Sequence, residues 1–261
     1  VFSGGIAAGI ANIGVLQVLE REGLKPDYIA GSSMGAIVGA LAALGYPAEV
    51  FDGILKKLNP LAIAELSENT MKEGLHGGVF RQKLRDFLGD LVDGKTIDDC
   101  TIPFLCVAGK VAKPIAWETI ATPGFTAEVL ASVEPHFFRH NTKLIDALMA
   151  TSAVPVLFSP VRIGDDTFID LCSFGAVPAR TLRDIYMPDV IIATDTQPRY
   201  ASLSKLLPQG WREFLRAGEA SLDESLAACD LVIKPDLPFG PLRFDKADAF
   251  VKAGRDAAEK A

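Results

Sequence analysis

The chain has few of the side chains that metal sites, disulfide frameworks and nucleic-acid surfaces require. Its 261 residues include only 3 histidines and 4 cysteines, and the cysteines show no C-x-x-C spacing, which disfavours a zinc site. The net charge is −7, with no basic cluster, so a nucleic-acid partner is not expected. Cysteines scattered in this way suit a reducing compartment. We therefore expect a cytoplasmic protein without a bound metal.

The chain also lacks an apolar run long enough to cross a bilayer. The most apolar window, Ile29 to Leu44, is shorter than the roughly 20 residues of a spanning helix and contains glycines and serines. It is therefore interpreted as a buried core helix. With 49% hydrophobic residues, the chain is expected to form one domain, residues 1–261, around a single core. The first residue is Val1 rather than methionine, so the question whether further residues precede it stays open.

Strands alternate with helices along the sequence. This order predicts an α/β fold of three layers, α/β/α, with a mostly parallel central sheet covered on both faces. The segment Thr122–Asn141 has no clear period and stays unassigned, and Glu68–Gly78 is interpreted as a surface loop or as a cover over a site. Strands are expected at 27–30, 102–111, 114–121, 167–169, 189–194 and 231–234, and helices at 10–22, 35–44, 48–58, 61–68, 79–91, 143–152, 178–185, 211–228 and 245–260.

A serine turn lies between the first complete strand and its helix. Gly31-Ser32-Ser33-Met34-Gly35 fits the pattern G-x-S-x-G, in which the serine occupies a strained turn with the helix N-terminus beneath it. Side chains at Gly31 and Gly35 would collide where the strand and helix backbones pass closely. The pattern predicts Ser33 as a nucleophile. The ordinary alternative is a serine that caps the helix.

The base that would activate this serine has to be found elsewhere in the chain. The only histidines are His76, His136 and His140, and none follows Asp170, so the usual order of serine, acid and then histidine is absent. Asp170 ends an apolar strand, where a buried carboxylate needs a partner. A carboxylate that acts directly on Ser33 as a dyad would supply such a base. A triad that uses His136 or His140 remains the alternative.

A glycine-rich turn, residues 3–9, connects the first strand to the first helix. Gly4, Gly5 and Gly9 occupy the first, second and sixth positions, whereas a dinucleotide loop requires the first, third and sixth. Such a turn presents backbone N–H groups to an anion. Its place before the serine turn favours an oxyanion hole. A nucleotide site and a plain tight turn are the alternatives.

Seven blocks of residues follow one another along the chain. They are Ser3-Gly4-Gly5, Gly9, Ile13-Gly14-Val15-Leu16, Ala30-Gly31-Ser32-Ser33-Met34-Gly35, Ser152-Ala153-Val154-Pro155, Phe158-Ser159-Pro160-Val161 and Asp170. Taken in this order, the blocks resemble the patatin-like phospholipases over essentially the whole chain. The resemblance implies the patatin-like fold and a Ser-Asp hydrolase of lipid acyl esters, with Ser33 as nucleophile, Asp170 as base and no cofactor. It implies an oxyanion hole at Gly4, Gly5, Ile6 and Ala7, and peripheral membrane contact. The oligomeric state is not indicated.

Several residues depart from the family's pattern. The loop usually reads G-G-G-x-R-G, but here Ile6 replaces the third glycine and Ala8 the arginine. Isoleucine resists the positive φ that glycine adopts. Leu171 and Cys172 follow the aspartate where D-G-G or D-G-A is usual, adding bulk beside the base. These departures motivate a second hypothesis, a weak or inactive relative that binds lipid or a protein partner in the same cleft. Further departures are Asn12, Gly175 and Ala176.

Overall fold

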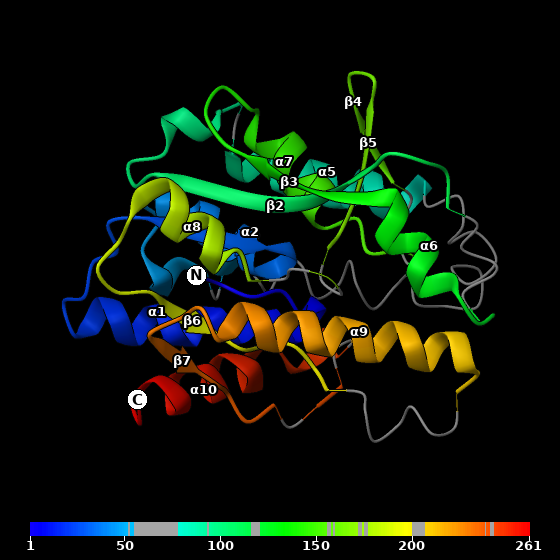
Figure 1. Ribbon diagram of the computed structural model, residues 1–261. Coiled ribbons are helices and arrows are strands. Elements are labelled where there is room, and N and C mark those ends of the chain that lie inside the picture. Colours follow the sequence, from blue (N-terminus) through cyan, green and yellow to red (C-terminus); the bar gives the residue numbers. More distant parts are fainter. Residues whose placement is uncertain are drawn as a thin grey trace.

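The structure is a computed structural model. It describes residues 1–51, 53–54, 78–92, 94–115, 121–155, 158, 160–171, 174, 177–199, 207–237, 239–240 and 243–261, and it confirms the predicted α/β class (Figure 1). The elements are η1 (Ile6–Ile10), α1 (Ala11–Arg21), β1 (Ile29–Ser32), α2 (Ser33–Ala43), η2 (Ala48–Val50), α5 (Gly78–Val92), η3 (Ile97–Asp99), β2 (Phe104–Val111), α6 (Phe125–Ser132), β3 (Val133–Phe138), α7 (Leu144–Thr151), β4 (Val161–Ile163), β5 (Asp166–Ile169), α8 (Ala179–Tyr186), β6 (Ile192–Thr194), α9 (Gln209–Leu226), β7 (Leu231–Ile233), η6 (Phe244–Lys246) and α10 (Ala247–Ala258).

The sheet is mixed, which corrects the expectation of a mostly parallel one. β1 pairs in parallel with β2, whereas β3 and β5 pair antiparallel with β2, and β4 pairs antiparallel with β5. The link between β4 and β5 holds only Gly164 and Asp165. Such a short link forces an antiparallel hairpin, because a parallel pair needs a long crossover. This β4–β5 hairpin is one source of the mixed sheet.

A second, two-stranded sheet pairs β6 with β7 in parallel. The first two residues of the chain lie between this pair and the main sheet. Phe2 forms a parallel bridge with Gly31 of β1, and the Thr194 N–H of β6 donates to the Val1 carbonyl at 3.0 Å. The start of the chain therefore connects the two sheets.

Helices cover both faces of the sheet, as the three-layer prediction requires. On β1 and β2, Ile29 and Phe104 belong to one buried cluster, which includes residues of α1, α2, α5, α7 and α10. Their neighbours Ala30 and Leu105 belong to another cluster, with residues of α8 and α9. Successive side chains of a strand point to opposite faces, so the two clusters are the two faces of the sheet.

Some predicted segments lie outside the described residues, wholly or in part. These are the helices at 48–58 and 61–68, the loop at 68–78 and the strand at 114–121. The unassigned segment Thr122–Asn141 contains α6 and β3. Pro135 is tolerated in β3 because, among the described strands, β3 pairs with β2 alone and so lies at an edge of the sheet.

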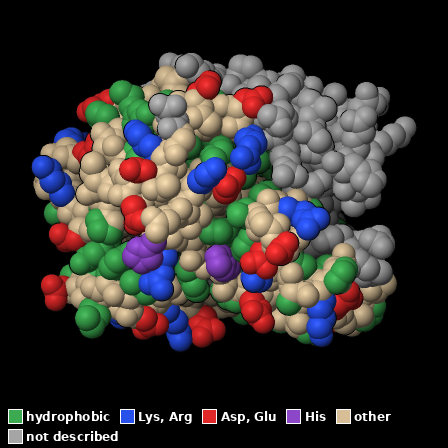
Figure 2. Space-filling view, turned by 90° about the horizontal axis from the view of Figure 1, so that it is seen from above, with side chains coloured by type: hydrophobic (Ala, Val, Ile, Leu, Met, Phe, Trp, Pro, Cys, Tyr) green, Lys and Arg blue, Asp and Glu red, His purple; other side chains and the backbone are tan. Residues whose placement is uncertain are grey.

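The described residues carry surface charges of both signs and three free cysteines. On the face seen from above, basic and acidic side chains are interspersed (Figure 2). Cys100, Cys106 and Cys229 are free thiols, and burial raises the pKa of Cys100 to about 11. Among the residues that the structure describes, no helix has the length and apolar character to span a membrane, and no cluster of acidic, histidine and cysteine side chains could hold a metal.

Candidate active site

Ser33 occupies a strained turn where β1 passes directly into α2. Its φ is 50°, in the left-handed region that residues other than glycine rarely adopt. A Cβ at Gly31 would lie 2.8 Å from the Ala36 backbone, and one at Gly35 would lie 2.3 Å from the Phe2 carbonyl oxygen. Both glycines are therefore required by close backbone approach, as the sequence predicts. The side chain of Ser33 is 3% exposed.

A threonine at the end of α7 supports this turn. The Ser33 N–H donates to Thr151 Oγ1 at 2.8 Å, and the Thr151 hydroxyl donates to the Val107 carbonyl of β2 at 2.6 Å. Thr151 is fully buried. It therefore ties the serine turn to the central strand. No sequence pattern marks Thr151, because its role depends on two backbone groups that are distant in the chain.

Two strands approach each other along one edge of β2. β1 is parallel to β2 and ends with Ser32 opposite Val107. β5 is antiparallel to β2 and ends with Ile169 opposite Gly109. β3 pairs with residues 106–111 of β2, a stretch that also contains partners of β1 and of β5. β3 therefore occupies one edge of β2, and β1 and β5 share the other edge. The ends of β1 and β5 therefore face each other.

This register brings Ser33 and Asp170 to the same place. Each is the residue that follows its strand, and Ala108 is the one position of β2 left between the two registers. Asp170 is 3% exposed, and its backbone N–H donates to the Ala153 carbonyl at 2.9 Å. Ala153 lies two residues after Thr151, which contacts Ser33. The chain at the end of α7 therefore contacts both candidate residues.

The glycine-rich turn packs against the serine. A Cβ at Gly4 would lie 3.0 Å from Ser33 Cβ. The Gly4 N–H donates to Ser32 Oγ at 3.2 Å, and the Ala8 N–H donates to the Gly5 carbonyl at 3.1 Å. Of the four residues that the resemblance implies for the oxyanion hole, Gly4 thus already uses its N–H within the protein.

Ile6 adopts the backbone conformation that its side chain was expected to resist. Its φ is 54°, next to Gly5 at 140°. A β-branched residue in this region is an outlier, and the cost is on the order of 1–3 kcal/mol. The turn therefore takes a glycine-like path despite Ile6, and Ala7 and Ala8 behind it are fully buried.

The bulk of Leu171 is accommodated on the sheet. A Cβ at Gly109 would lie 3.1 Å from Leu171 Cγ, so the side chain of Leu171 covers the space that glycine leaves on β2. It is 4% exposed. Cys172, Gly175 and Ala176 lie outside the described residues.

The histidines have other surroundings. His136 lies on β3, across β2 from β1, which corresponds to about 10 Å between strands. Its ring packs on Phe138 and Phe168, and burial together with the nearby Lys110 lowers its pKa. His140 lies 3.5 Å from Asp98. Among the described residues neither histidine bonds to Ser33, and His76 lies outside them.

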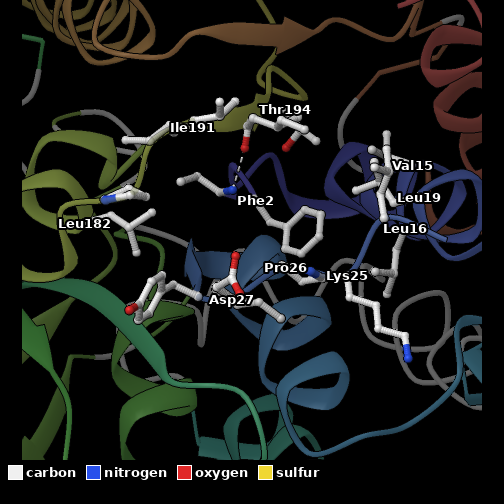
Figure 3. A pocket seen from close by; sticks show the side chains of 17 residues that line it. Phe2, Val15, Leu16, Leu19, Lys25, Pro26, Asp27, Leu182, Ile191 and Thr194 are labelled. Atoms are coloured by element: carbon white, nitrogen blue, oxygen red, sulfur yellow. Dashed lines mark hydrogen bonds between the residues drawn. The ribbon is translucent and has the colours of Figure 1, made fainter. Parts of the chain in front are cut away.

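An apolar cavity lies at the opposite end of β1. It has a volume of about 200 Å³ and is lined by residues such as Leu16, Leu182 and Ile191 (Figure 3). Its lining includes Tyr28 and Ile29 at the start of β1, about 13 Å from the end of a four-residue strand. This cavity is therefore separate from the serine turn.

These features define a class: an α/β protein with a strained serine between a strand and a helix and a buried aspartate at the end of a facing strand. The chain belongs to the patatin-like phospholipase family, because the family model described as patatin-like phospholipase matches residues 1–170, more than half of the chain. Membership in this family supports the interpretation of the protein as a hydrolase of lipid esters.

Individual relatives match shorter or weaker stretches. An uncharacterized NTE family protein of Mycobacterium bovis is 38% identical over 107 residues, which cover 41% of this chain and 28% of that protein. A second such protein of the same organism is 28% identical over 277 aligned residues, covering 100% of this chain and 46% of that protein. The lysophospholipase NTE1 of Saccharomyces cerevisiae is 42% identical over 57 residues, covering 22% of this chain and 3% of that protein.

The chain therefore spans less than half the length of these curated relatives. Among solved structures, VipD from Legionella pneumophila is similar with a TM-score of 0.45 and 14% identity, covering 99% of this chain and 65% of that one.

Proposed function

We propose that this protein is a serine acyl hydrolase of lipid esters in which Ser33 and Asp170 form a catalytic dyad. The observation that carries the proposal is the register on β2, in which the strands that end at these two residues run toward each other beside Ala108. The strained φ of 50° at Ser33 supports it, because strain of this kind concentrates at functional sites.

In the first step Ser33 Oγ attacks the ester carbonyl carbon while Asp170 accepts the hydroxyl proton. The dyad then returns this proton to the leaving alcohol, and the acyl group remains on Ser33. A carboxylate pKa is ordinarily about 4, so Asp170 is a weak base toward a hydroxyl. Both residues are only 3% exposed, so the proton transfer takes place in a site that excludes most water.

The tetrahedral intermediate carries a negative oxygen that needs N–H donors. We assign this role to the turn Gly4 to Ala7, which packs against Ser33 through Gly4. Since the Gly4 N–H donates to Ser32 Oγ, the donors to the substrate oxygen are the N–H groups of Gly5, Ile6 and Ala7. Water then attacks the acyl carbon with Asp170 as base, and the fatty acid leaves.

The substrate class follows from the family and remains part of the proposal. A lipid or other acyl ester fits a patatin-like phospholipase domain, and one matched relative is named a lysophospholipase. Peripheral membrane contact and a cytoplasmic location stay predictions.

The direct test is hydrolysis of short p-nitrophenyl esters and of lysophospholipid by purified variants. Ser33→Ala and Asp170→Asn should each lower kcat by on the order of 10³-fold or more, because removal of a nucleophile or its base abolishes the covalent route. A fluorophosphonate probe should label the wild type and not Ser33→Ala.

The matched controls are Ser225→Ala on α9 and Asp165→Asn in the exposed turn of the same β4–β5 hairpin. Both should keep wild-type kcat. Hydrolysis that survives Ser33→Ala at the wild-type rate would refute the assignment.

The second candidate is a relative that binds lipid in the same cleft with little or no turnover. The strained Ile6 favours it, since an N–H displaced from the oxyanion position would cost on the order of 100-fold or more in rate. Absence of probe labelling together with saturable fatty-acid binding would support this candidate over the enzyme.

A further inference from the structure

A buried polar cluster lies on the other side of the glycine-rich turn from Ser33. Its four side chains, Ser3, Asn12, Thr194 and Thr196, are between 0% and 1% exposed. They come from the start of the chain, from α1 and from the end of β6. Thr194 lies close to the start of the chain (Figure 3). Buried polar groups are costly unless they are bonded, so their bonding shows what the cluster holds.

Asn12 and Thr194 fix the backbone of Ser3 on both sides. Asn12 Nδ2 donates to the Ser3 carbonyl at 2.9 Å, and the Ser3 N–H donates to Thr194 Oγ1 at 3.0 Å. The Thr194 hydroxyl donates in turn to Asn12 Oδ1 at 2.5 Å. These three bonds close a ring, so the residue that precedes the two glycines has a fixed orientation.

Thr196 contacts all three residues of the turn's start. Its N–H donates to Ser3 Oγ at 2.8 Å, and its hydroxyl donates to the Gly4 carbonyl at 2.7 Å. The Ser3 hydroxyl can then donate to Thr196 Oγ1 across the remaining 2.9 Å contact. A Cβ at Gly5 would lie 2.4 Å from the Thr196 carbonyl oxygen. The Thr196 hydroxyl also lies 3.2 Å from the Ser3 carbonyl oxygen, a longer contact that shares the proton given to Gly4.

The bond from Thr196 to the Gly4 carbonyl has a consequence for catalysis. The carbonyl of Gly4 and the N–H of Gly5 belong to one planar trans peptide, so the two groups point to opposite sides. Holding the carbonyl toward Thr196 therefore directs the Gly5 N–H away from Thr196. Gly4 also packs against Ser33, since a Cβ added to it would lie 3.0 Å from Ser33 Cβ, so the peptide that carries this N–H lies beside the serine.

We propose that Thr196 is a positioning residue that orients the Gly5 N–H toward the oxygen that becomes negative in the reaction. Thr194 and Asn12 anchor the same turn one residue earlier. The inference rests on the proposed hydrolase function and concerns Thr194 and Thr196, which no motif of the sequence marks. The strained φ of Ile6 next to this peptide makes such anchoring necessary, since an unsupported turn would relax.

The test replaces the hydroxyl of Thr196 by a methyl group of similar volume. Thr196→Val should lower kcat by about 10- to 100-fold with little change in KM, because a misdirected N–H is lost only in the transition state. Thr196→Ser keeps the hydroxyl and should restore kcat to within about 3-fold of the wild type. Thr142→Val is the matched control, because its hydroxyl also donates to a backbone carbonyl, that of Arg139 at 3.0 Å.

A second readout separates positioning from a structural role. The wild type should hydrolyse a p-nitrophenyl ester far faster than the matching thionoester, because sulfur accepts hydrogen bonds poorly. Thr196→Val should lower this ester-to-thionoester ratio, whereas a general loss of folded enzyme lowers both rates equally. Thr196→Ala is measured in parallel, in case one of the two variants does not fold. The ester-to-thionoester ratio of the variant that retains the wild-type circular dichroism spectrum then decides between a positioning and a structural role.

These measurements distinguish failure of the proposed function from failure of the role of Thr196. A wild type that hydrolyses neither substrate overturns the proposed function. A wild type that is active, with Thr196→Val or Thr196→Ala keeping both kcat and the ratio unchanged, overturns the role of Thr196 alone.

Discussion

Ile6 holds a backbone conformation that its own side chain opposes. Its φ of 54° lies in the left-handed region, where a Cβ crowds the following carbonyl oxygen. The neighbouring Gly5 is fixed against the Thr196 carbonyl, so the turn imposes this conformation on Ile6. The strain identifies this position as one at which glycine is the better residue.

A pair of truncations at Ile6 tests this strain. Both Ile6→Gly and Ile6→Ala remove the side chain, but only glycine relieves the positive φ. We expect Ile6→Gly to be more stable than Ile6→Ala by about 1 kcal/mol, measured by denaturant unfolding. At positions with ordinary φ the order is reversed, with alanine favoured by about 0.5–1 kcal/mol. An alanine variant more stable than the glycine variant would contradict the strain.

At this scale the sequence predicts residues that belong to a motif and misses those that act through the backbone. Ser33, Gly31 and Gly35 stand in a recognisable pattern, and the structure bears out their local geometry. Thr151 and Thr196 leave no such pattern, because they bond to backbone groups more than 100 positions away. The catalytic roles of Ser33 and Asp170 stay predictions.

Among the elements, α7 has a role beyond packing. Its last residue, Thr151, joins the Ser33 N–H to the Val107 carbonyl, and all three groups are buried. The short segment after it contacts Asp170 through Ala153. The end of this helix therefore sets how the serine turn lies relative to the strand that brings the aspartate.

Removal of the Thr151 hydroxyl should be costly. Thr151→Val leaves a buried N–H and a buried carbonyl without their bonds, which we expect to reduce the free energy of unfolding by about 1–3 kcal/mol. It should also lower kcat, since Ser33 loses a support. Thr151→Ser retains the hydroxyl and should lie close to the wild type in both denaturant unfolding and turnover. A valine variant as stable as the serine variant would refute this role.

The positions of the elements were largely predictable, and their pairing was less so. Apolar periodicity located α1, α2, α5, α7, α8, α9 and α10 to within a few residues. The sequence pattern predicts the first complete strand at Asp27–Ala30, whereas β1 runs over Ile29–Ser32, because pairing with β2 and with Phe2 extends it. Strand direction depends on long-range pairing, which local pattern does not contain.

On the scale of the whole molecule, the first and last helices are joined by two glycines. A Cβ at Gly14 of α1 would lie 1.9 Å from the Val251 carbonyl oxygen, and one at Gly254 of α10 would lie 1.9 Å from that of Ala11. The helix backbones therefore approach too closely for any side chain (Figure 1). The last helix is thus part of the same core as the serine helix.

Gly254→Ala should therefore destabilise the protein by about 3 kcal/mol or more, because overpacking against backbone exceeds the gain of about 1 kcal/mol in helix propensity. Gly89→Ala on α5 is the matched control, since nothing lies within 4 Å of its added Cβ, and it should stabilise slightly. Calorimetry should show one transition that shifts down for Gly254→Ala, as the predicted single domain requires. Two transitions, with only one of them shifted, would contradict that prediction.

The cluster that holds the glycine-rich turn also bears on how the protein is made. Ser3 and its partner Thr196 are separated by 193 positions. A ribosome that adds about 5–20 residues per second needs roughly 10–40 s to cover that distance. During this interval the turn has none of its β6 partners, although the serine turn that it serves has already been synthesised. A nascent chain thus carries Ser33 long before the turn beside it is anchored, so any activity that depends on Ser33 should arise only late in synthesis.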